Sequence, residues 1–185
     1  MFLTGLPSNT GQILGTAAKL GFEPQWIGQA PTWIPALSES KDLLPTLRRS
    51  YLVVSDGPQW GDTSVPGMRK MLADIAAHRP DQRPDIYFAA GYAQAKAVTA
   101  LLEAAVAGGD LSRAGIVAAQ RRLGTVDLEG LFGNYGYGAP EQRNPTRTTT
   151  IFRVNPAVPG ALEAVKASFI TKAGAEFSFA RYLHH

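Results

Sequence analysis

The sequence contains no cysteine and only three histidines, and both scarcities limit its chemistry. Without cysteine the chain forms no disulfide and no cysteine-ligated metal site. His78 falls at the end of a predicted helix, and His184 and His185 form the tail, so none is placed to complete a catalytic triad. The nucleophile-elbow pattern and the paired histidines of a helical zinc site are also missing. The sequence therefore predicts no catalytic site, no metal site and no cofactor.

The chain also lacks a dense basic stripe and an uninterrupted apolar run. Its net charge is only +3, and the scattered Lys and Arg residues do not indicate nucleic-acid binding. The longest apolar stretch, residues 86–107, contains polar residues such as Lys96 and Glu103, which favours a buried helix over a membrane span. With 45% hydrophobic and 18% charged residues, the composition is that of an ordinary globular protein.

Strand and helix patterns alternate along the chain, which indicates an α/β sheet. The predicted strands cover residues 2–5, 24–28, 50–55 and 148–154. The predicted helices cover residues 10–20, 36–49 with a break near Pro45, 64–78, 86–107 and 112–123. The long helix is apolar nearly all round and is expected to be mostly buried. The glycine-rich residues 130–138 are expected to form turns, and the chain after residue 154 to be irregular.

Polar and aromatic residues follow the first three predicted strands. In open parallel sheets, ligands gather outside the carboxyl ends of the strands. Residues 6–9 follow the first strand and open a helix, so their hydroxyl, amide and free N–H groups suit a carboxylate or another anion. Residues 29–33 and 55–60 follow the next two strands. The simpler alternative is that the serine only caps the helix and that the tryptophans only pack.

The order and spacing of these segments carry a family resemblance. The matching segments are Leu3–Phe22, Gln25–Gly28, Tyr51–Val54, Gly91–Gln94, Leu101–Ala105, Gly130–Gly133 and Arg147–Val154. Taken together, they resemble the C-terminal half of the branched-chain amino-acid type of ABC-transporter substrate-binding protein. This is the leucine/isoleucine/valine-binding family of type I periplasmic binding proteins. The resemblance extends to about residue 165.

The resemblance implies an α/β fold in which a parallel sheet is flanked by helices and ligand binds between two lobes. Residues 1–58 would belong to the second, C-terminal lobe and residues 59–130 to an incomplete first lobe. Residues 131–185 would cross back and form the C-terminal segment. The hinge crossings would lie near residues 55–59 and in the glycine-rich stretch, where small residues absorb backbone rotation. As part of a larger protein, the fragment would expose apolar surface and is expected to self-associate.

The resemblance also implies ligand contacts, and the sequence departs from two of them. The family's aromatic contact falls at Leu6 or Pro7, and its acidic residue, which pairs with an ammonium group, falls at Ala30. An unpaired buried ammonium is costly, so an ordinary α-amino acid is less expected than an apolar or aromatic carboxylate or amide. The candidate ligand-binding residues are Leu6, Pro7, Ser8, Asn9, Gln29, Ala30, Trp33, Asp56 and Trp60.

The resulting hypothesis is a solute-binding component of an ABC importer, not an enzyme. It would capture a small carboxylate, amide or amino-acid-like ligand, aromatic or apolar, by lobe closure without a chemical step. Its partners would be the ligand and the transporter permease, and its location periplasmic or extracytoplasmic, with a signal peptide upstream of this fragment. One alternative is a ligand-sensing regulatory or receptor domain of the same fold. Another is an α/β enzyme that uses Ser8 or Asp56.

Overall fold

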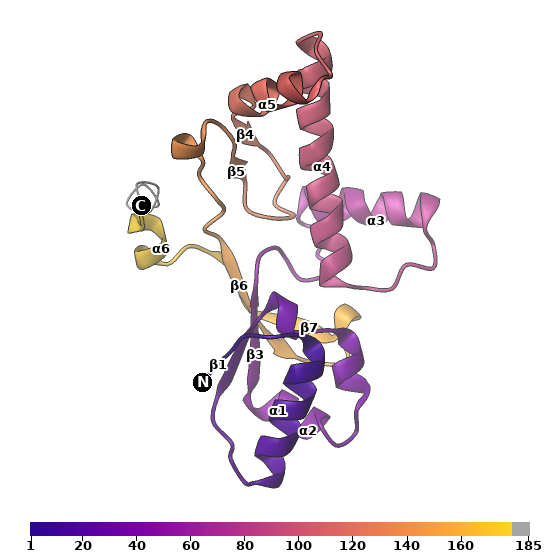
Figure 1. The fold of residues 1–185 in the computed structure, drawn as a ribbon. Coiled ribbons are helices and arrows are strands. Elements are labelled where there is room, and N and C mark those ends of the chain that lie inside the picture. Colours follow the sequence, from indigo (N-terminus) through magenta and orange to yellow (C-terminus); the bar gives the residue numbers. More distant parts are fainter. Residues whose placement is uncertain (179–185) are drawn as a thin grey trace.

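Five strands form one sheet in the computed structural model, which describes residues 1–178. The sheet and its helices make up one unit, and a group of helices forms a second unit above it (Figure 1). In spatial order the strands are β1 (Phe2–Leu3), β2 (Trp26–Gln29), β3 (Tyr51–Ser55), β6 (Thr149–Val154) and β7 (Leu162–Phe169). Long apolar runs place β2 and β3 at the middle of this sheet, where both neighbours are strands.

The sheet is parallel on one side and antiparallel on the other. β1, β2 and β3 run parallel, with Gln29 opposite Val54, whereas β6 is antiparallel to both β3 and β7. The prediction of a parallel sheet is therefore correct for the first three strands. The prediction of an irregular chain after residue 154 is wrong, because β7 lies there. Half of the residues of β7 are exposed, so it lacks the alternating apolar pattern that would have revealed it.

Two helices accompany the sheet, α1 (Pro7–Lys19) and α2 (Leu44–Ser50), with short 3-10 turns between β2 and α2. α1 begins with Pro7 in its first turn, where a missing N–H has no cost. The side chain of Asn9, not that of Ser8, caps this end by accepting a hydrogen bond of 3.1 Å from the Leu6 N–H. Gly21 follows the helix with a φ of 68°, as a helix-ending glycine does.

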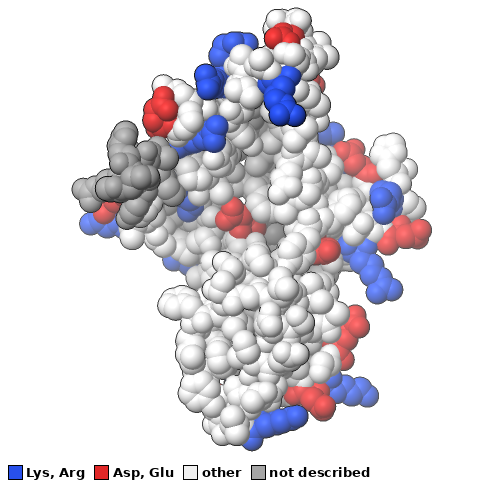
Figure 2. Space-filling view, viewed as in Figure 1, with Lys and Arg blue, Asp and Glu red and all other residues white. Residues whose placement is uncertain are grey.

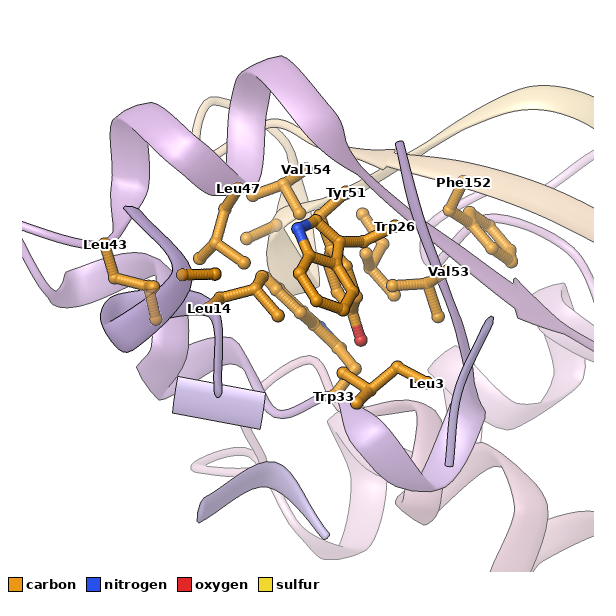
Figure 3. Packing of buried hydrophobic residues seen from close by; sticks show 13 residues of the cluster. Leu3, Leu14, Trp26, Trp33, Leu43, Leu47, Tyr51, Val53, Phe152 and Val154 are labelled. Carbon is orange, nitrogen blue, oxygen red and sulfur yellow. The ribbon is translucent and has the colours of Figure 1, made fainter. Parts of the chain in front are cut away.

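The core of this sheet unit is built around large aromatic side chains (Figure 3). Trp33 is fully buried and lies 6.3 Å from the ring of Tyr51. The Tyr51 hydroxyl shares a 2.5 Å hydrogen bond with the Thr32 hydroxyl, and the Thr10 hydroxyl donates to the Thr32 carbonyl at 2.9 Å. These bonds satisfy the buried hydroxyls and fix the turn after β2 against α1, whereas the indole N–H groups of Trp26 and Trp33 are buried without a hydrogen-bond partner among the described residues.

The helix unit contains three helices and a short two-stranded ribbon. The helices are α3 (Pro66–His78), α4 (Ile86–Ala107) and α5 (Arg113–Arg122), and the ribbon pairs β4 (Thr125–Val126) with β5 (Tyr135–Gly136). α4 is its long axis, with α5 crossing the far end and α3 beside the other (Figure 1). The side chain of Ser112 caps α5 by accepting from the Gly115 N–H at 3.1 Å. The last helix, α6 (Lys172–Glu176), follows β7 and lies apart from both units.

The prediction that α4 is mostly buried is wrong. Its buried positions are three alanines, whereas Val98, Leu102 and Val106 are 53%, 42% and 61% exposed. The neighbouring elements cover only one side of this helix, so its uniformly apolar sequence leaves an apolar face open. Within residues 1–178, no helix is long and apolar enough to cross a membrane.

Candidate functional site

The two units are joined by two crossings that lie side by side. The chain leaves β3 towards the helix unit and returns into β6, where Ser55 lies opposite Thr150. The Thr150 hydroxyl donates a 2.7 Å hydrogen bond to the Gly57 carbonyl. Gly57 has a φ of 86°, and a Cβ there would lie 2.6 Å from the Leu131 carbonyl oxygen. Only glycine fits this close approach without strain.

A small cavity of ≈ 20 Å³ lies where the outgoing crossing meets the helix unit. Its lining residues come from the crossing, from α3 and α4, and from the loop after β4. They are Asp56, Gly57, Pro58, Trp60, Met68, Ile86, Ala89, Leu131 and Phe132. Trp60 is held by an edge-on contact with Phe88 of α4, with 6.3 Å between the ring centroids. The walls are therefore apolar, and Asp56 is the sole ionisable residue among those that line the cavity.

Asp56 lies at the base of this crevice, directly after β3. Its side chain is half-buried, and burial raises the pKa of its carboxyl above the ordinary value. Within residues 1–178, its carboxylate has neither an ion pair nor a hydrogen bond. The neighbouring Ser55 hydroxyl donates to the Asp56 backbone carbonyl at 3.2 Å and so leaves the carboxylate uncompensated.

The ends of β1 and β2 lie at the same edge as Asp56, because parallel strands end together. This edge faces the start of α4 (Figure 1). The Tyr87 hydroxyl, in the first turn of α4, donates to the Ala30 carbonyl at 3.4 Å and bridges the two units. Tyr87 is 41% exposed and Leu6 is 64% exposed. Both units therefore expose apolar surface near the strand ends, Leu6 after β1 and Tyr87 in the first turn of α4.

The structure brings some of the predicted site residues together and separates others. Asp56 and Trp60 line one cavity, and Ala30 contacts the opposite unit through Tyr87. Of the remaining residues, Pro7 is half-buried and the others, Leu6, Ser8, Asn9 and Gln29, are exposed near the ends of β1 and β2. Trp33, in contrast, is 0% exposed and lies in the core. The expectation that it lines the site does not hold, because its ring follows the 3-10 turn at residues 30–32 and lies among the core side chains of the sheet unit (Figure 3).

Several lining residues were missed by the sequence interpretation. Met68, Ile86 and Phe132 come from the helix unit, as does Tyr87, which contacts Ala30 without lining the cavity. Apolar residues of this kind give no chemical signal in a sequence. The one usable signal was Asp85, whose side chain caps α4 by accepting from the Tyr87 N–H at 2.9 Å and so fixes where this helix begins.

The crevice offers binding groups but no catalytic constellation. No histidine lines it, and Ser8 makes no hydrogen bond to a histidine or carboxylate in the described chain. Over residues 1–178, no group of His, Asp and Glu side chains could hold a metal ion. His184 and His185 lie outside the described residues. The arrangement can hold and orient a ligand.

A larger hollow of ≈ 700 Å³ lies between residues 58–66 and β7. It shares Pro58 and Trp60 with the crevice but is otherwise bounded by residues such as Ala164 and Ser168. This hollow lies over β7, the outer strand of the antiparallel side, and no residue of β1 or β2, or of the turns that follow their carboxyl ends, lines it. Ligands of open α/β sheets gather at those ends, so the crevice beside Asp56 is the better candidate.

Comparison with known proteins gives a consistent result. A family model described as "Periplasmic binding protein" matches residues 1–160, and among curated proteins none matches the chain. A fatty acid ABC transporter substrate-binding protein from Thermomonospora curvata is 22% identical, with a TM-score of 0.81 over 95% of this chain and 44% of that one. A branched-chain amino acid ABC transporter protein from Thermus thermophilus, with bound valine, is 15% identical, with a TM-score of 0.66 over 94% and 46%.

A third solved structure, the leucine-binding protein LivK from Thermotoga maritima, is 18% identical, with a TM-score of 0.66 over 91% of this chain and 44% of that one. At these identities the likeness concerns the fold, and it confirms the prediction of an α/β architecture of the type I periplasmic-binding-protein class. The chain spans less than half the length of each of these three solved proteins.

Proposed function

The chain belongs to the family of periplasmic binding proteins, and on that premise we propose that it forms part of the solute-binding component of an ABC importer. The observation that carries the proposal is the placement of three parallel strand ends opposite the start of α4, across a paired crossing. A ligand held there touches both units, so its binding energy favours the arrangement in which they are closed together. The family is one of solute-binding proteins, and the chain would act by capture.

We assign the sheet unit to the second lobe of such a protein and the helix unit to part of the first. In this assignment residues 1–58 belong to the second lobe, residues 59–130 to the first, and the chain after residue 131 crosses back. Support comes from the two separate hydrophobic clusters, one around Trp33 and one around Met71. Gly57 and Thr150, at the paired crossings, would then form the hinge.

The proposed ligand is a small molecule with an apolar body and a polar end: a carboxylate, an amide or an amino-acid-like group. Leu6 and Tyr87 expose apolar surface for the body of such a ligand, and Ala30 leaves no carboxylate at its position. The names of the solved relatives, one for fatty acids and one with bound valine, fit an apolar body. Delivery to a permease from a periplasmic or extracytoplasmic location completes the proposal.

A ligand panel tests this function on the longest gene product that contains the chain. Octanoate, octanamide, phenylacetate and leucine would be compared by thermal shift and by calorimetry. We expect octanamide to raise the melting temperature more than leucine does. Trp60→Leu should weaken that binding, whereas Phe22→Leu, an exposed aromatic outside the crevice, should not. Stabilisation by leucine with no response to the apolar acids and amide would count against the proposed ligand.

A further inference from the structure

We propose that Asp56 is the polar anchor of the crevice and selects a ligand whose polar end donates N–H hydrogen bonds, as an alkylammonium or a primary amide does. This inference rests on the proposed function, because it names the ligand class of the same crevice. It starts from an imbalance: the crevice holds one carboxylate and, among its lining residues, no group that compensates it.

The surroundings of Asp56 leave its carboxylate without a partner. The hydroxyls of the neighbouring Ser55 and of Thr150 on the paired crossing are engaged elsewhere, since Ser55 donates to the Asp56 backbone carbonyl at 3.2 Å and Thr150 donates to the Gly57 carbonyl at 2.7 Å. The lining residues from the facing elements, such as Met68 on α3, Ile86 on α4 and Phe132 on the return loop, are uncharged. Burial consequently raises the pKa of the Asp56 carboxyl. A carboxylate withdrawn from water without a partner is costly, and a ligand donor offsets that cost.

The size of the cavity restricts which part of a ligand reaches Asp56. A volume of ≈ 20 Å³ accommodates roughly one water-sized group, so it admits a terminal –NH₃⁺ or –NH₂ and excludes a hydrocarbon chain. The body of the ligand then lies outside the cavity. Leu6 and Tyr87 expose apolar surface at that edge of the sheet, on opposite sides of the gap between the units. An apolar tail with a small donor head matches both regions.

The sign of the ligand's charge follows from the same geometry. A ligand carboxylate beside Asp56 would place two like charges in one apolar crevice, and one of them would have to take a proton. An ammonium instead pairs with the charged form of Asp56. Affinity for an amine should therefore be highest above the pKa of Asp56 and fall as the pH drops through it, whereas affinity for a carboxylate should rise over the same range. A neutral amide should change least.

The experiment compares hexylamine, hexanamide and hexanoate by calorimetry at neutral pH, with the longest gene product that contains the chain. We expect the amine and the amide to bind more tightly than hexanoate. Asp56→Asn should weaken hexylamine binding about 10- to 100-fold, the range of a charged hydrogen bond, and should strengthen hexanoate binding. Asp62→Asn is the matched control, because Asp62 lies on the same loop, is exposed and already accepts hydrogen bonds from the Ser64 N–H at 3.1 Å and hydroxyl at 2.6 Å.

The outcomes separate this inference from the proposed function. Tightest binding of hexanoate, unaffected by Asp56→Asn, overturns the role of Asp56 and leaves ligand capture standing. No binding of any apolar acid, amide, amine or leucine overturns both. If the variant does not fold, an NMR titration of the wild-type Asp56 carboxyl gives the answer: added hexylamine should lower its pKa, and an unchanged pKa in the presence of bound hexylamine rejects the assignment.

Discussion

The sheet unit and the helix unit bury very different side chains. The sheet unit encloses Trp26, Trp33, Tyr51 and Phe152, each at most 4% exposed. The buried residues of α4 and α5, in contrast, are small: alanines and one glycine. The larger buried side chains of the helix unit, such as Met68, Met71 and Leu131, come from α3 and the loop after β4, and its aromatic residues are only partly buried. Fully buried aromatic side chains bury more apolar area than these, so the sheet unit gains more from the hydrophobic effect.

The exposed surface completes the comparison. The apolar face of α4 remains open at Val98, Leu102 and Val106, whereas the middle strands of the sheet have strand neighbours on both sides. A helix that buries only one small-residue face derives little stability from packing. This difference indicates that local unfolding costs more free energy in the sheet unit than in the helix unit. We therefore expect amide hydrogens of β2, β3 and β6 to exchange with solvent more slowly than those of α4 and α5.

Trp33→Ala should destabilise the sheet unit and have the largest effect on the free energy of unfolding. Removing a fully buried tryptophan from the core is expected to lower the free energy of unfolding by about 3–5 kcal/mol. Trp60→Ala, at a half-buried site between the units, should cost only about 1–2 kcal/mol. Urea unfolding followed by circular dichroism measures both. A greater loss for Trp60→Ala would reverse the proposed ranking of the two units.

Gly57→Ala should be the next most damaging change, because it strikes the junction between the units. The new Cβ would meet the Leu131 carbonyl oxygen at 2.6 Å in a backbone conformation with φ of 86°, so we expect a loss of about 2–3 kcal/mol. Gly61→Ala is the matched control: its φ is 90°, but nothing lies within 4 Å of a Cβ there, and the loss should be about 1 kcal/mol. If urea unfolding gave equal losses of unfolding free energy for the two variants, the close approach of residue 57 to the Leu131 carbonyl would not account for the loss.

Local signals made the long helix and the third strand predictable from the sequence. Both ends of α4 are as predicted, because Asp85 caps it and Gly108 follows its last residue. β3 was predicted within one residue from its continuous apolar run. β7 was missed because half of its residues are exposed, and such a strand does not need an alternating apolar pattern. The exposure of α4 was also missed, since composition does not say which neighbours cover a helix.

The candidate site was only half predictable, for a related reason. The strand ends could be located from turn residues, and Asp56 and Trp60 were identified in this way. Trp33 was misplaced, because a 3-10 turn of three residues decides whether its side chain faces the crevice or the core. The residues that the helix unit contributes, Tyr87 and Phe132, approach the strand ends only because of how the chain crosses between the units. No local sequence pattern predicts that approach.

Tyr92→Phe probes the helix unit, and its effect should be modest and dependent on pH. The Tyr92 hydroxyl donates to Asp74 and so joins α4 to α3. Burial, followed by this hydrogen bond, raises the pKa of Tyr92 to about 12 from an ordinary value of 10.0. The bond therefore stabilises the fold below pH 10, and its contribution is lost as the pH rises towards 12. Urea unfolding at pH 8 should show a loss of about 0.5–1 kcal/mol, and the difference from wild type should vanish in strong alkali. A difference that persists there would exclude this bond as the cause.

Glu163→Gln probes the sheet unit at the opposite end of the pH scale and should have the smallest effect. Arg153 donates two hydrogen bonds to this carboxylate, at 2.9 and 2.8 Å, and Asn155 donates a third at 2.7 Å. The hydrogen bonds from Arg153, then that from Asn155, lower the pKa of Glu163 to about 2 from an ordinary value of 4.5. Because the folded state holds the proton less tightly than the unfolded chain, the pairing of β6 with β7 is stabilised above pH 4.5 and loses that contribution as the pH falls towards 2. The difference in urea midpoint between wild type and variant should thus be greatest near neutral pH and should disappear in acid. Glu176→Gln is the control: this residue forms an exposed i,i+4 ion pair on α6, and its substitution should leave the urea midpoint unchanged. A constant difference down to pH 2 would mean that the substitution acts through packing, and the acid sensitivity of the sheet unit would then have to arise elsewhere.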